Sequence, residues 1–315
     1  MTKVHFNAGD ALFWPRRGAI HYRAPMEEWE DFVAGLLTER RIEAIVLFGQ
    51  CRRYHLTAIE AARRLRVAVY VFEEGYLRPW WITLERDGVN ADSPLADVSS
   101  CKLPPAPELA SPATFRYGFA KMGMYSFLYF FVGTLFKFAY PHYTHHRPFR
   151  WGKVVPWARS GVRKWLYRLT ERKAVESLLQ PPAGRYFLVP LQVQMDSQLR
   201  FHSAWNSNAE FIRQVISSFA ARAPGYTRLV FKHHPMERGH THYGKVIRAL
   251  AEEFGVSERV VYIHDGHLPT LLQHARGVVV VNSTTGLQAM HHGTAVHVCG
   301  RSFYAKPGLV SPGSL

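Results

Sequence analysis

Short apolar runs alternate with longer segments of helical spacing along most of this 315-residue chain. In the first half, the run Ala44–Phe48 is followed by Tyr54–Leu65, where small and apolar residues recur every three or four positions, and then by Val67–Phe72. Apolar runs of this length indicate buried strands, and the spacing between them indicates a helix. The order strand, helix, strand predicts a parallel pair, because parallel strands need a crossover connection.

The second half of the chain repeats this alternation more regularly. Five short strands separated by helices favour a doubly wound sheet with helices on both faces. The expected strands are Tyr186–Val189, Arg228–Lys232, Val260–Ile263, Val278–Val281 and Ala295–Val298. The expected helices are Ala209–Ala221, His242–Phe254, Leu268–His274 and Thr285–His292.

We place a domain boundary near residue 180. One more helix is predicted at Ser160–Leu179, after which Pro181, Pro182 and Gly184 interrupt the helical spacing. A chain of this length can bury two ordinary cores. We therefore predict an α/β protein with two Rossmann-type domains, residues 1–180 and 181–315, and a cleft between them. Neither half contains a GxGxxG or GxxxxGKS/T motif, which argues against dinucleotide and Walker-type sites.

Positive charge is concentrated in one aromatic-rich segment. The net charge is +15, and residues 111–180 contain twelve Lys and Arg against two Glu, a local balance of +10. This composition is typical of a contact with an anionic membrane surface or of a single-strand nucleic-acid groove, and a buried aromatic helix pair with a basic rim is the structural alternative. Met122–Tyr140 contains Lys137 and two glycines, so we do not expect it to span a bilayer. No nucleic-acid-binding motif accompanies the charge, so we expect peripheral membrane association and no nucleic-acid partner.

The cysteine and histidine patterns indicate a cytoplasmic protein without a metal centre. The three cysteines show no CxxC spacing, and the first residues lack the pattern of a secretory signal. We therefore expect neither a disulfide framework nor a thiolate metal site. Histidine pairs occur at 145–146, 233–234 and 291–292, but neighbouring histidines point apart in strands and in helices, so no metal site is predicted.

Two segments bring anion-binding groups to the ends of predicted strands. RLVFKHHP, residues 228–235, ends a strand with Lys232, His233 and His234. GVVVVNSTTGLQA, residues 277–289, places Asn282–Thr285 where a helix would begin. Phosphates bind at the carboxyl ends of parallel strands and at helix N-termini. The two segments together predict a nucleotide-phosphate site, and helix capping by Ser and Thr is the simpler alternative for the second segment.

Two acidic positions are candidates for catalysis. Glu74, with Glu73 before it, comes directly after one predicted strand, and Asp196 follows the first strand of the second half. A proton-transferring acid and a nucleophilic carboxylate on opposite walls of a cleft are what retaining glycosyl chemistry requires. The alternatives are a turn salt bridge between Glu73 or Glu74 and Arg78, and a helix cap or turn at Asp196.

Six motifs in a fixed order carry a family resemblance. They are GQCRRYH (49–55), FEEGYLRPWWITLE (72–85), LQVQMDSQ (191–198), FKHHPMERG (231–239), YIHDGHLPTLL (262–272) and NSTTGLQAM (282–290). This combination resembles the bacterial capsule polysaccharide biosynthesis and export family, whose characterised members are β-Kdo glycosyltransferases. The resemblance extends over nearly the whole chain and implies a GT-B-like fold. Family members usually continue into further helices, so we expect this chain to be shortened at its C-terminus.

The resemblance also implies a reaction and its residues. The donor would be CMP-β-Kdo, the acceptor a phosphatidylglycerol-type lipid or Kdo already attached to it, and the transfer retaining, without metal or cofactor. Asp196 would form a covalent Kdo adduct, and Glu74 would move the proton. The nucleotide would be held by Lys232, His234, Pro235, Asn282, Ser283, Thr284 and Gly286. The Kdo group would be bound by Arg52, Arg78 and Gln192, since arginine offers a bidentate fork to a carboxylate.

Such an enzyme would work as a peripheral protein on the inner face of the cytoplasmic membrane, where other capsule assembly proteins are candidate partners. The competing hypothesis is a non-catalytic assembly or export component that binds a glycolipid in the same cleft. The presence of both Asp196 and Glu74 favours the transferase.

Overall fold

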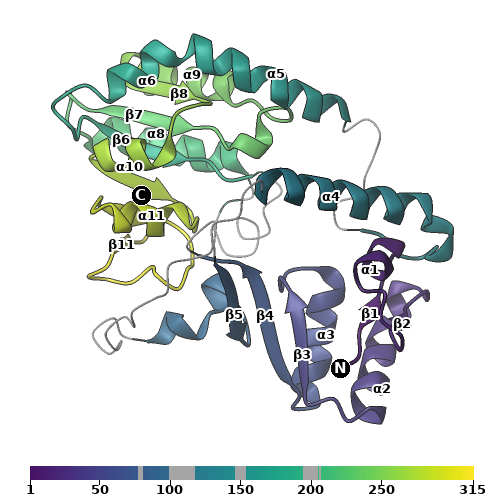
Figure 1. Ribbon diagram of the computed structural model, residues 1–315. Coiled ribbons are helices and arrows are strands. Elements are labelled where there is room, and N and C mark those ends of the chain that lie inside the picture. Colours follow the sequence, from purple (N-terminus) through teal and green to yellow (C-terminus); the bar gives the residue numbers. More distant parts are fainter. Residues whose placement is uncertain (77–80, 99–117, 146–153, 194–204, 206) are drawn as a thin grey trace. The chain divides into compact units, whose positions relative to one another are not determined.

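The computed structural model describes residues 1–76, 81–98, 118–145, 154–193, 205 and 207–315. The chain divides into two compact units (Figure 1). Unit 1 contains Met1–Gly75, Trp80–Val89 and Ala106–Lys153, and unit 2 contains Tyr76–Pro79, Asn90–Pro105 and Val154–Leu315. The candidates Asp196 and Arg78 lie outside the described residues, and so do the turn and salt-bridge alternatives that involve them.

Unit 2 is built on a six-stranded, fully parallel sheet. Its spatial order is β11-β10-β9-β6-β7-β8, so in chain order the strands run 3-2-1-4-5-6 from the opposite edge. This is the order of a Rossmann sheet, and its direction of winding reverses between β6 and β9. The strands are β6 (Tyr186–Pro190), β7 (Arg228–Lys232), β8 (Val260–Ile263), β9 (Gly277–Val280), β10 (Val296–Val298) and β11 (Ser311–Pro312).

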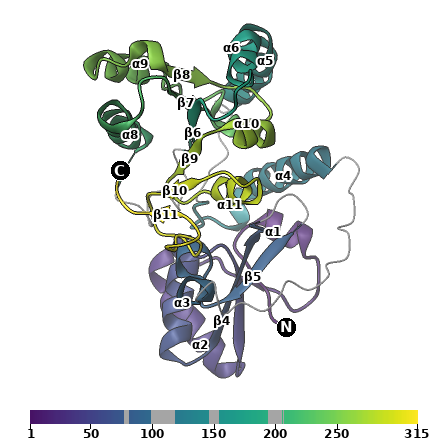
Figure 2. The same ribbon diagram turned by 90° about the vertical axis from the view of Figure 1, so that its left-hand side faces the viewer.

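Helices cover both faces of this sheet, which explains why its strands are continuous apolar runs. Leu229 and Phe231 of β7 pack into one core cluster, and Val230 between them packs into the other. Figure 2 shows α8 and α9 on one side of the sheet and α6 and α10 on the other. The helices are α5 (Val154–Thr170), α6 (Arg172–Leu178), α8 (Asn208–Arg222), α9 (Gly244–Glu253), α10 (Leu268–His274) and α11 (Thr285–His291), with 3-10 turns η2 (Asn90–Asp92), η3 (Pro94–Asp97), η7 (Pro235–Glu237) and η8 (Ser257–Arg259).

The expected elements of the second half are confirmed to within two residues at each end, with one correction before them. The single helix predicted at Ser160–Leu179 is two helices, because α5 ends at Thr170 and α6 begins at Arg172. The Thr170 hydroxyl donates to the carbonyl of Leu166, and the carboxylate of Glu171 is bound by groups at the end of β8. Both helices precede the boundary that we placed at residue 180, and both cluster with unit 2.

Unit 1 contains a smaller three-stranded sheet. β3 (Ala44–Phe48) and β4 (Ala68–Glu74) are parallel, as predicted, and β5 (Ile82–Arg86) adds an antiparallel strand that we did not predict. Apolar residues of α2 (Trp29–Glu39) and α3 (Arg53–Arg64) cover one face of the sheet. The remaining elements are the parallel pair β1 (Val4–His5) and β2 (Ile20–His21), the helices α1 (Ala8–Phe13) and α4 (Gly118–Leu135), and the turns η1 (Met26–Glu28) and η5 (Lys137–Ala139).

The long helix α4 rests on α1. A side chain at Gly9 of α1 would collide with the ring and backbone of Tyr129, so glycine permits this close approach. The Asn7 amide donates to the Tyr129 hydroxyl at 2.7 Å, and that hydroxyl donates to the carboxylate of Asp10. Burial and, to a smaller extent, the nearby Asp10 raise the pKa of the Tyr129 phenol, which keeps this hydroxyl protonated at physiological pH. One side of α4 is therefore fixed on unit 1.

Candidate functional site

A pair of buried amides joins the two strands where the winding of the unit 2 sheet reverses. Gln192 follows β6 and Asn282 follows β9. The Gln192 side chain donates to Asn282 Oδ1 at 3.0 Å and accepts from the Asn282 backbone N–H at 3.5 Å. Ligands of open α/β sheets bind beyond the carboxyl ends of the strands at this reversal point. The structure thus brings together two predicted site residues that lie 90 positions apart.

Asn208 anchors the same edge from the start of α8. Its amide nitrogen donates to the Gln192 carbonyl at 2.8 Å and to the Tyr243 hydroxyl at 3.0 Å. Buried polar groups are retained where their hydrogen bonds are made, so this set holds the backbone after β6 in one position. The chain from this point leads into residues 194–204, which include Asp196 and lie outside the described residues.

The Ser-Thr turn between β9 and α11 divides its hydroxyls between capping and other roles. Ser283 Oγ accepts the N–H of Thr285 at 3.2 Å, and the Ser283 carbonyl accepts the N–H of Gly286 at 2.9 Å. Thr284 occupies the cap position of α11 but makes no side-chain capping bond. The capping alternative therefore explains the Ser283 side chain but not the Thr284 hydroxyl. Two of the first helical N–H groups are used inside the turn, so an anion here would depend on hydroxyl donors.

Lys232 ends β7 as a buried cation. Burial and, to a smaller extent, the neighbouring Arg238 charge lower its pKa to about 8, and the charges of Asp265 and Glu171 oppose this shift. A buried ammonium group gains most from an anionic ligand, because the ligand replaces the hydration that burial removed. Lys232 therefore suits the binding of a phosphate or carboxylate at this edge of the sheet.

His234 is oriented by the turn that follows it. It is the cap residue of η7, and its Nδ1 accepts the N–H of Met236 at 3.2 Å. In the neutral imidazole the proton then lies on Nε2, which makes that nitrogen a hydrogen-bond donor. Pro235 opens η7 and fixes the backbone after His234. The turn thus orients the His234 ring as a hydrogen-bond donor, and Pro235 helps to fix its position.

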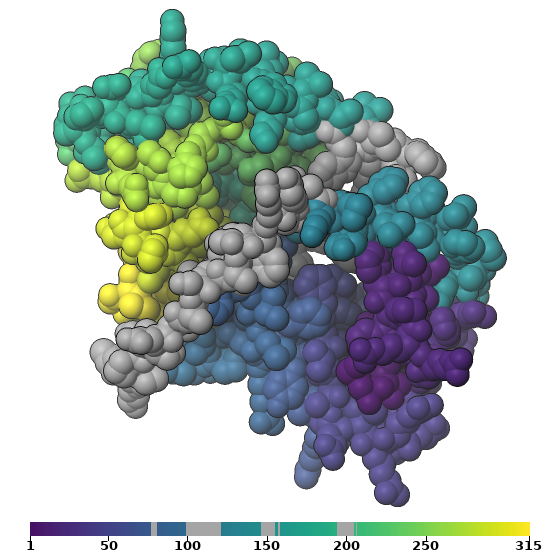
Figure 3. Space-filling view, viewed as in Figure 1, coloured from purple at the N-terminus to yellow at the C-terminus, as the bar shows by residue number. Residues whose placement is uncertain are grey.

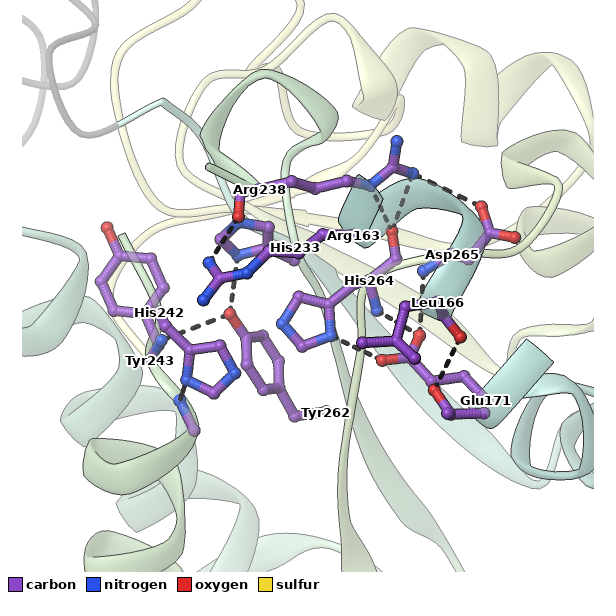
Figure 4. A network of polar contacts seen from close by, with 12 residues as sticks. Arg163, Leu166, Glu171, His233, Arg238, His242, Tyr243, Tyr262, His264 and Asp265 are labelled. Atoms are coloured by element: carbon purple, nitrogen blue, oxygen red, sulfur yellow. Dashed lines mark hydrogen bonds and ion pairs between the residues drawn. The ribbon is translucent and has the colours of Figure 1, made fainter. Parts of the chain in front are cut away.

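A polar network that sequence reasoning did not assign joins Glu171, Arg238 and the chain after β8 (Figure 4). Glu171 Oε2 accepts the backbone N–H groups of His264 at 2.7 Å and of Asp265 at 3.0 Å, and Oε1 lies 2.6 Å from His264 Nδ1. Arg238 donates to the His264 carbonyl at 3.0 Å and contacts the Asp265 carboxylate at 3.4 Å. The chain after β8 is therefore held from both sides. The His-Asp pair at a strand end could have signalled this network, whereas Glu171 at a helix joint carries no sequence signal.

His233 belongs to this network and not to the ligand edge. Its Nδ1 lies 2.6 Å from the Tyr262 hydroxyl, and its ring packs 4.9 Å from that of His264. Burial and, to a smaller extent, the neighbouring His264 lower the pKa of His233 to about 3. His233 is thus a neutral packing residue at physiological pH, which agrees with its omission from the predicted site.

Two further predicted site residues lie at one edge of the unit 1 sheet. Arg52 directly precedes α3, and its guanidinium lies over the ring of Phe48 at 4.9 Å. Glu74 is the exposed last residue of β4. Since β3 and β4 are parallel, the loop after β3 and the end of β4 share the carboxyl edge of the sheet. Gly49 allows the sharp turn after β3, with a φ of 73° that favours glycine.

The side chains that the structure describes form no group of three metal-ligating residues. Within the same residues, no helix is both long and apolar enough to cross a membrane.

The Rossmann order and the polar groups at the reversal point define an α/β protein with buried polar side chains at the carboxyl edge of its parallel sheet. Comparison with known families then gives its group. Residues 43–315 match the family described as capsule polysaccharide biosynthesis protein, and the chain belongs to that family.

Individual relatives agree with this membership, and a solved structure shares the fold. The chain is 37% identical to the capsule polysaccharide export protein KpsS of Escherichia coli, over its whole length and 81% of the relative. It is 36% identical to the capsule polysaccharide modification protein LipB of Neisseria meningitidis serogroup B, over 99% of this chain and 77% of the relative. The structure of the beta Kdo 2,4 transferase of Thermosulfurimonas dismutans KpsC matches 99% of the chain and 83% of its own, with a TM-score of 0.51 at 15% identity. That likeness confirms the α/β fold class with parallel sheets.

Proposed function

We propose that this chain is a retaining β-Kdo glycosyltransferase of capsule polysaccharide biosynthesis. It would transfer Kdo from CMP-β-Kdo to a phosphatidylglycerol or lysophosphatidylglycerol lipid, or to Kdo already attached to that lipid. The observation that carries this proposal is the joined pair Gln192 and Asn282 at the winding reversal, flanked by Lys232 and His234 at the next strand end. Membership of a capsule family supports the choice of sugar.

The proposed donor site lies at the carboxyl edge of the unit 2 sheet. The phosphate of CMP would accept from His234 Nε2, from the Thr284 hydroxyl and from the Lys232 ammonium. Pro235, Asn282, Ser283 and Gly286 would shape the backbone around it. As CMP leaves, these donors stabilise the growing phosphate charge without a metal ion or other cofactor.

The proposed reaction is a double displacement. A carboxylate oxygen of Asp196 attacks the anomeric carbon of Kdo, and the bond to the CMP phosphate breaks. The acceptor hydroxyl then attacks the same carbon, the bond to Asp196 breaks, and the hydroxyl proton passes to Glu74. Two inversions give retention. The proposal requires a GT-B-like arrangement in which Glu74, Arg52 and Arg78 face the donor across a cleft, with the two arginines and Gln192 binding the Kdo group.

We further propose that α1 and α4 form a membrane-facing surface on unit 1. In Figure 3 the atoms of α4 lie on the molecular surface above those of α1. Phe127 is 60% exposed and Phe138 is 77% exposed, and Lys121 and Lys137 lie on the same segment. Residues 118–140 carry these exposed rings and two lysines and contain no Asp or Glu, a composition that suits the headgroup region of an anionic bilayer. Exposure of these rings disfavours the buried helix pair that was the alternative. The protein would then act peripherally on the inner face of the cytoplasmic membrane, beside other capsule assembly proteins and without a nucleic-acid partner.

Mass spectrometry of the intact protein tests the reaction. After incubation with CMP-β-Kdo made in place and without acceptor, we expect an added Kdo mass that maps to Asp196. The mass should be absent in Asp196→Ala, which should still bind CMP because the nucleotide contacts remain. Glu74→Gln should form the adduct yet transfer Kdo slowly, since it retains the nucleophile and loses the proton acceptor.

A non-catalytic role in assembly or export is the second candidate, favoured by the name of the E. coli relative. It predicts glycolipid binding with no adduct and no turnover on a phosphatidylglycerol acceptor. That pair of negative results would replace the transferase proposal.

A further inference from the structure

One loop of unit 2, residues 301–306, contacts two motifs that are far apart in sequence. It follows β10, and its central residues are Phe303 and Tyr304. Their rings are 5.5 Å apart at 82°, so the two neighbouring side chains extend toward different partners. No role was predicted for this loop from the sequence.

Tyr304 holds the Ser-Thr turn. It is only 2% exposed, and its hydroxyl donates to the carbonyl of Ser283. A Cβ at position 286 would lie 2.6 Å from that hydroxyl and 2.9 Å from the ring, so only glycine fits there. The tyrosine therefore fixes the position of the Ser283–Gly286 turn relative to the end of β9. Burial also raises the pKa of Tyr304, which keeps its hydroxyl a proton donor.

Phe303 holds the chain that follows β4. Its ring packs on the ring of Tyr76 with centroids 4.4 Å apart at 32°. The Tyr76 hydroxyl accepts the N–H of Asn90 at 2.6 Å. This hydrogen bond connects the residues that precede and follow the segment containing β5. Tyr76 stands two positions after Glu74 in the motif that carries the proposed proton acceptor.

Two cations at the ends of the loop strengthen the same contact. The Lys306 ammonium donates to the carbonyls of Leu95 and Val98 at the C-terminal end of η3, where positive charge is favourable. Arg301 lies 3.4 Å from the carboxylate of Asp92 in η2. The segment from Asn90 to Val98 is thereby attached to the end of the unit 2 sheet, although it is encoded some 200 positions earlier.

We propose that Phe303 and Tyr304 are positioning residues for the transfer, Tyr304 acting on the nucleotide turn and Phe303 on the chain directly after Glu74. This inference rests on the proposed function. Displacement chemistry requires the leaving group and the proton acceptor to be held at fixed separation, and errors of an ångström cost large factors in rate. The loop contacts both Tyr76 and the Ser283–Gly286 turn within unit 2, so a shift of either segment would strain the loop's contact with the other.

Two substitutions separate the roles, with CMP binding and Kdo transfer measured on each variant. Tyr304→Phe removes the hydroxyl and keeps the ring, so the Kd for CMP should rise about threefold to tenfold, the usual effect of one lost hydrogen bond. Phe303→Leu should leave the Kd within about twofold and lower kcat about tenfold with little change in KM for the donor. Phe303→Tyr keeps the stacked ring and should restore the rate.

The controls distinguish a failed inference from a failed function. Tyr226→Phe, at an exposed tyrosine elsewhere in unit 2, should change neither quantity. Thermal midpoints identify variants that merely unfold, and Phe303→Tyr against Phe303→Leu compares two folded proteins. If the wild type binds CMP and transfers Kdo while Phe303→Leu does both equally well, the positioning role is wrong. If the wild type binds no CMP and transfers no Kdo, the proposed function is wrong instead.

Discussion

Lys232 is the residue of the site whose charge depends most directly on its surroundings. Because its pKa in the folded protein is about 8, against 10.5 for an ordinary lysine, it begins to lose its proton within the range of practical buffers. The unfolded chain then binds more protons than the folded one between about pH 8 and 10.5, so this group adds to stability as pH rises through that window. Ligand binding should show the opposite trend.

We predict that CMP affinity falls as pH rises from 7 to 9.5, because Lys232 loses the charge that attracts the phosphate. Calorimetric titration of the wild type across this range measures the trend. Lys232→Met should bind weakly and with a flat profile over the same range. An unchanged slope in that variant would assign the titration to another group.

His234 offers a test that separates turn geometry from ligand binding. His234→Asn places an acceptor oxygen where Nδ1 now caps the N–H of Met236, and it removes the Nε2 donor. CMP affinity should fall about threefold to tenfold while the thermal midpoint stays near that of the wild type. A loss of midpoint without loss of affinity would make His234 a capping residue only.

The sequence singled out polar residues at the strand ends, whose binding roles remain predictions, but it did not single out the residues that support them. Lys232, His234, Asn282 and Ser283 were recognisable because polar side chains at strand ends have few structural reasons to be there. Glu171 was not, since a glutamate between two helices resembles any solvated surface residue until the fold brings β8 against it. Asp196 and Arg78, which fall outside the described residues, remain predictions.

At the scale of elements, the break between α5 and α6 places Glu171 against the end of β8. Its carboxylate accepts two backbone N–H groups and contacts a buried histidine. Breaking a buried network that leaves donors unsatisfied costs about 1–3 kcal/mol per group.

We predict that Glu171→Ala lowers the free energy of unfolding by about 2–4 kcal/mol, whereas Glu171→Gln, which keeps one acceptor oxygen, costs less. Denaturant titration measures both. The matched control is Glu176→Gln, which breaks the exposed pair with Arg172 and should leave the free energy of unfolding nearly unchanged. Equal effects at positions 171 and 176 would contradict the role of the network.

A second prediction at this scale concerns membrane binding by the α1 and α4 surface. Replacing Phe127, Phe131 and Phe138 by serine should reduce co-sedimentation with vesicles of phosphatidylglycerol and phosphatidylethanolamine, because the exposed rings supply the apolar contact. Ile82→Ser, at a 77% exposed apolar residue on the unit 1 sheet, serves as the control. Loss of binding in both variants to the same degree would point to nonspecific adhesion.

The spacing of apolar residues predicted most helices and strands of the second half correctly, because strands and helices have different apolar periods. It failed where the local signal was weak. The antiparallel strand β5 follows two tryptophans and a proline, which resemble a loop, and it forms because β4 offers an open edge. The helix break at Glu171 was missed because apolar spacing continues across it.

At the scale of the molecule, length and alternation predicted two Rossmann-type domains, residues 1–180 and 181–315, whereas the contacts divide the chain into two units with other bounds. Sequence order could not show that unit 2 includes Tyr76 and Asn90–Val98. Those segments join unit 2 through Phe303, Arg301 and Lys306, and such long-range contacts leave no local pattern. Whether these two segments belong to unit 2 therefore depends on partners about two hundred positions away in the sequence.

That interleaving constrains how the protein is made on the ribosome. Asp92 is synthesised 209 positions before Arg301, its partner. At bacterial rates of 5–20 residues per second, Tyr76 and the turns η2 and η3 wait roughly 10–40 s for the loop that receives them. During this interval Tyr76 and the turns η2 and η3 lack their contacts with Phe303, Arg301 and Lys306. Synthesis of residues 301–306 therefore completes both the contacts of the Ser283–Gly286 turn and those of a segment that emerged long before it.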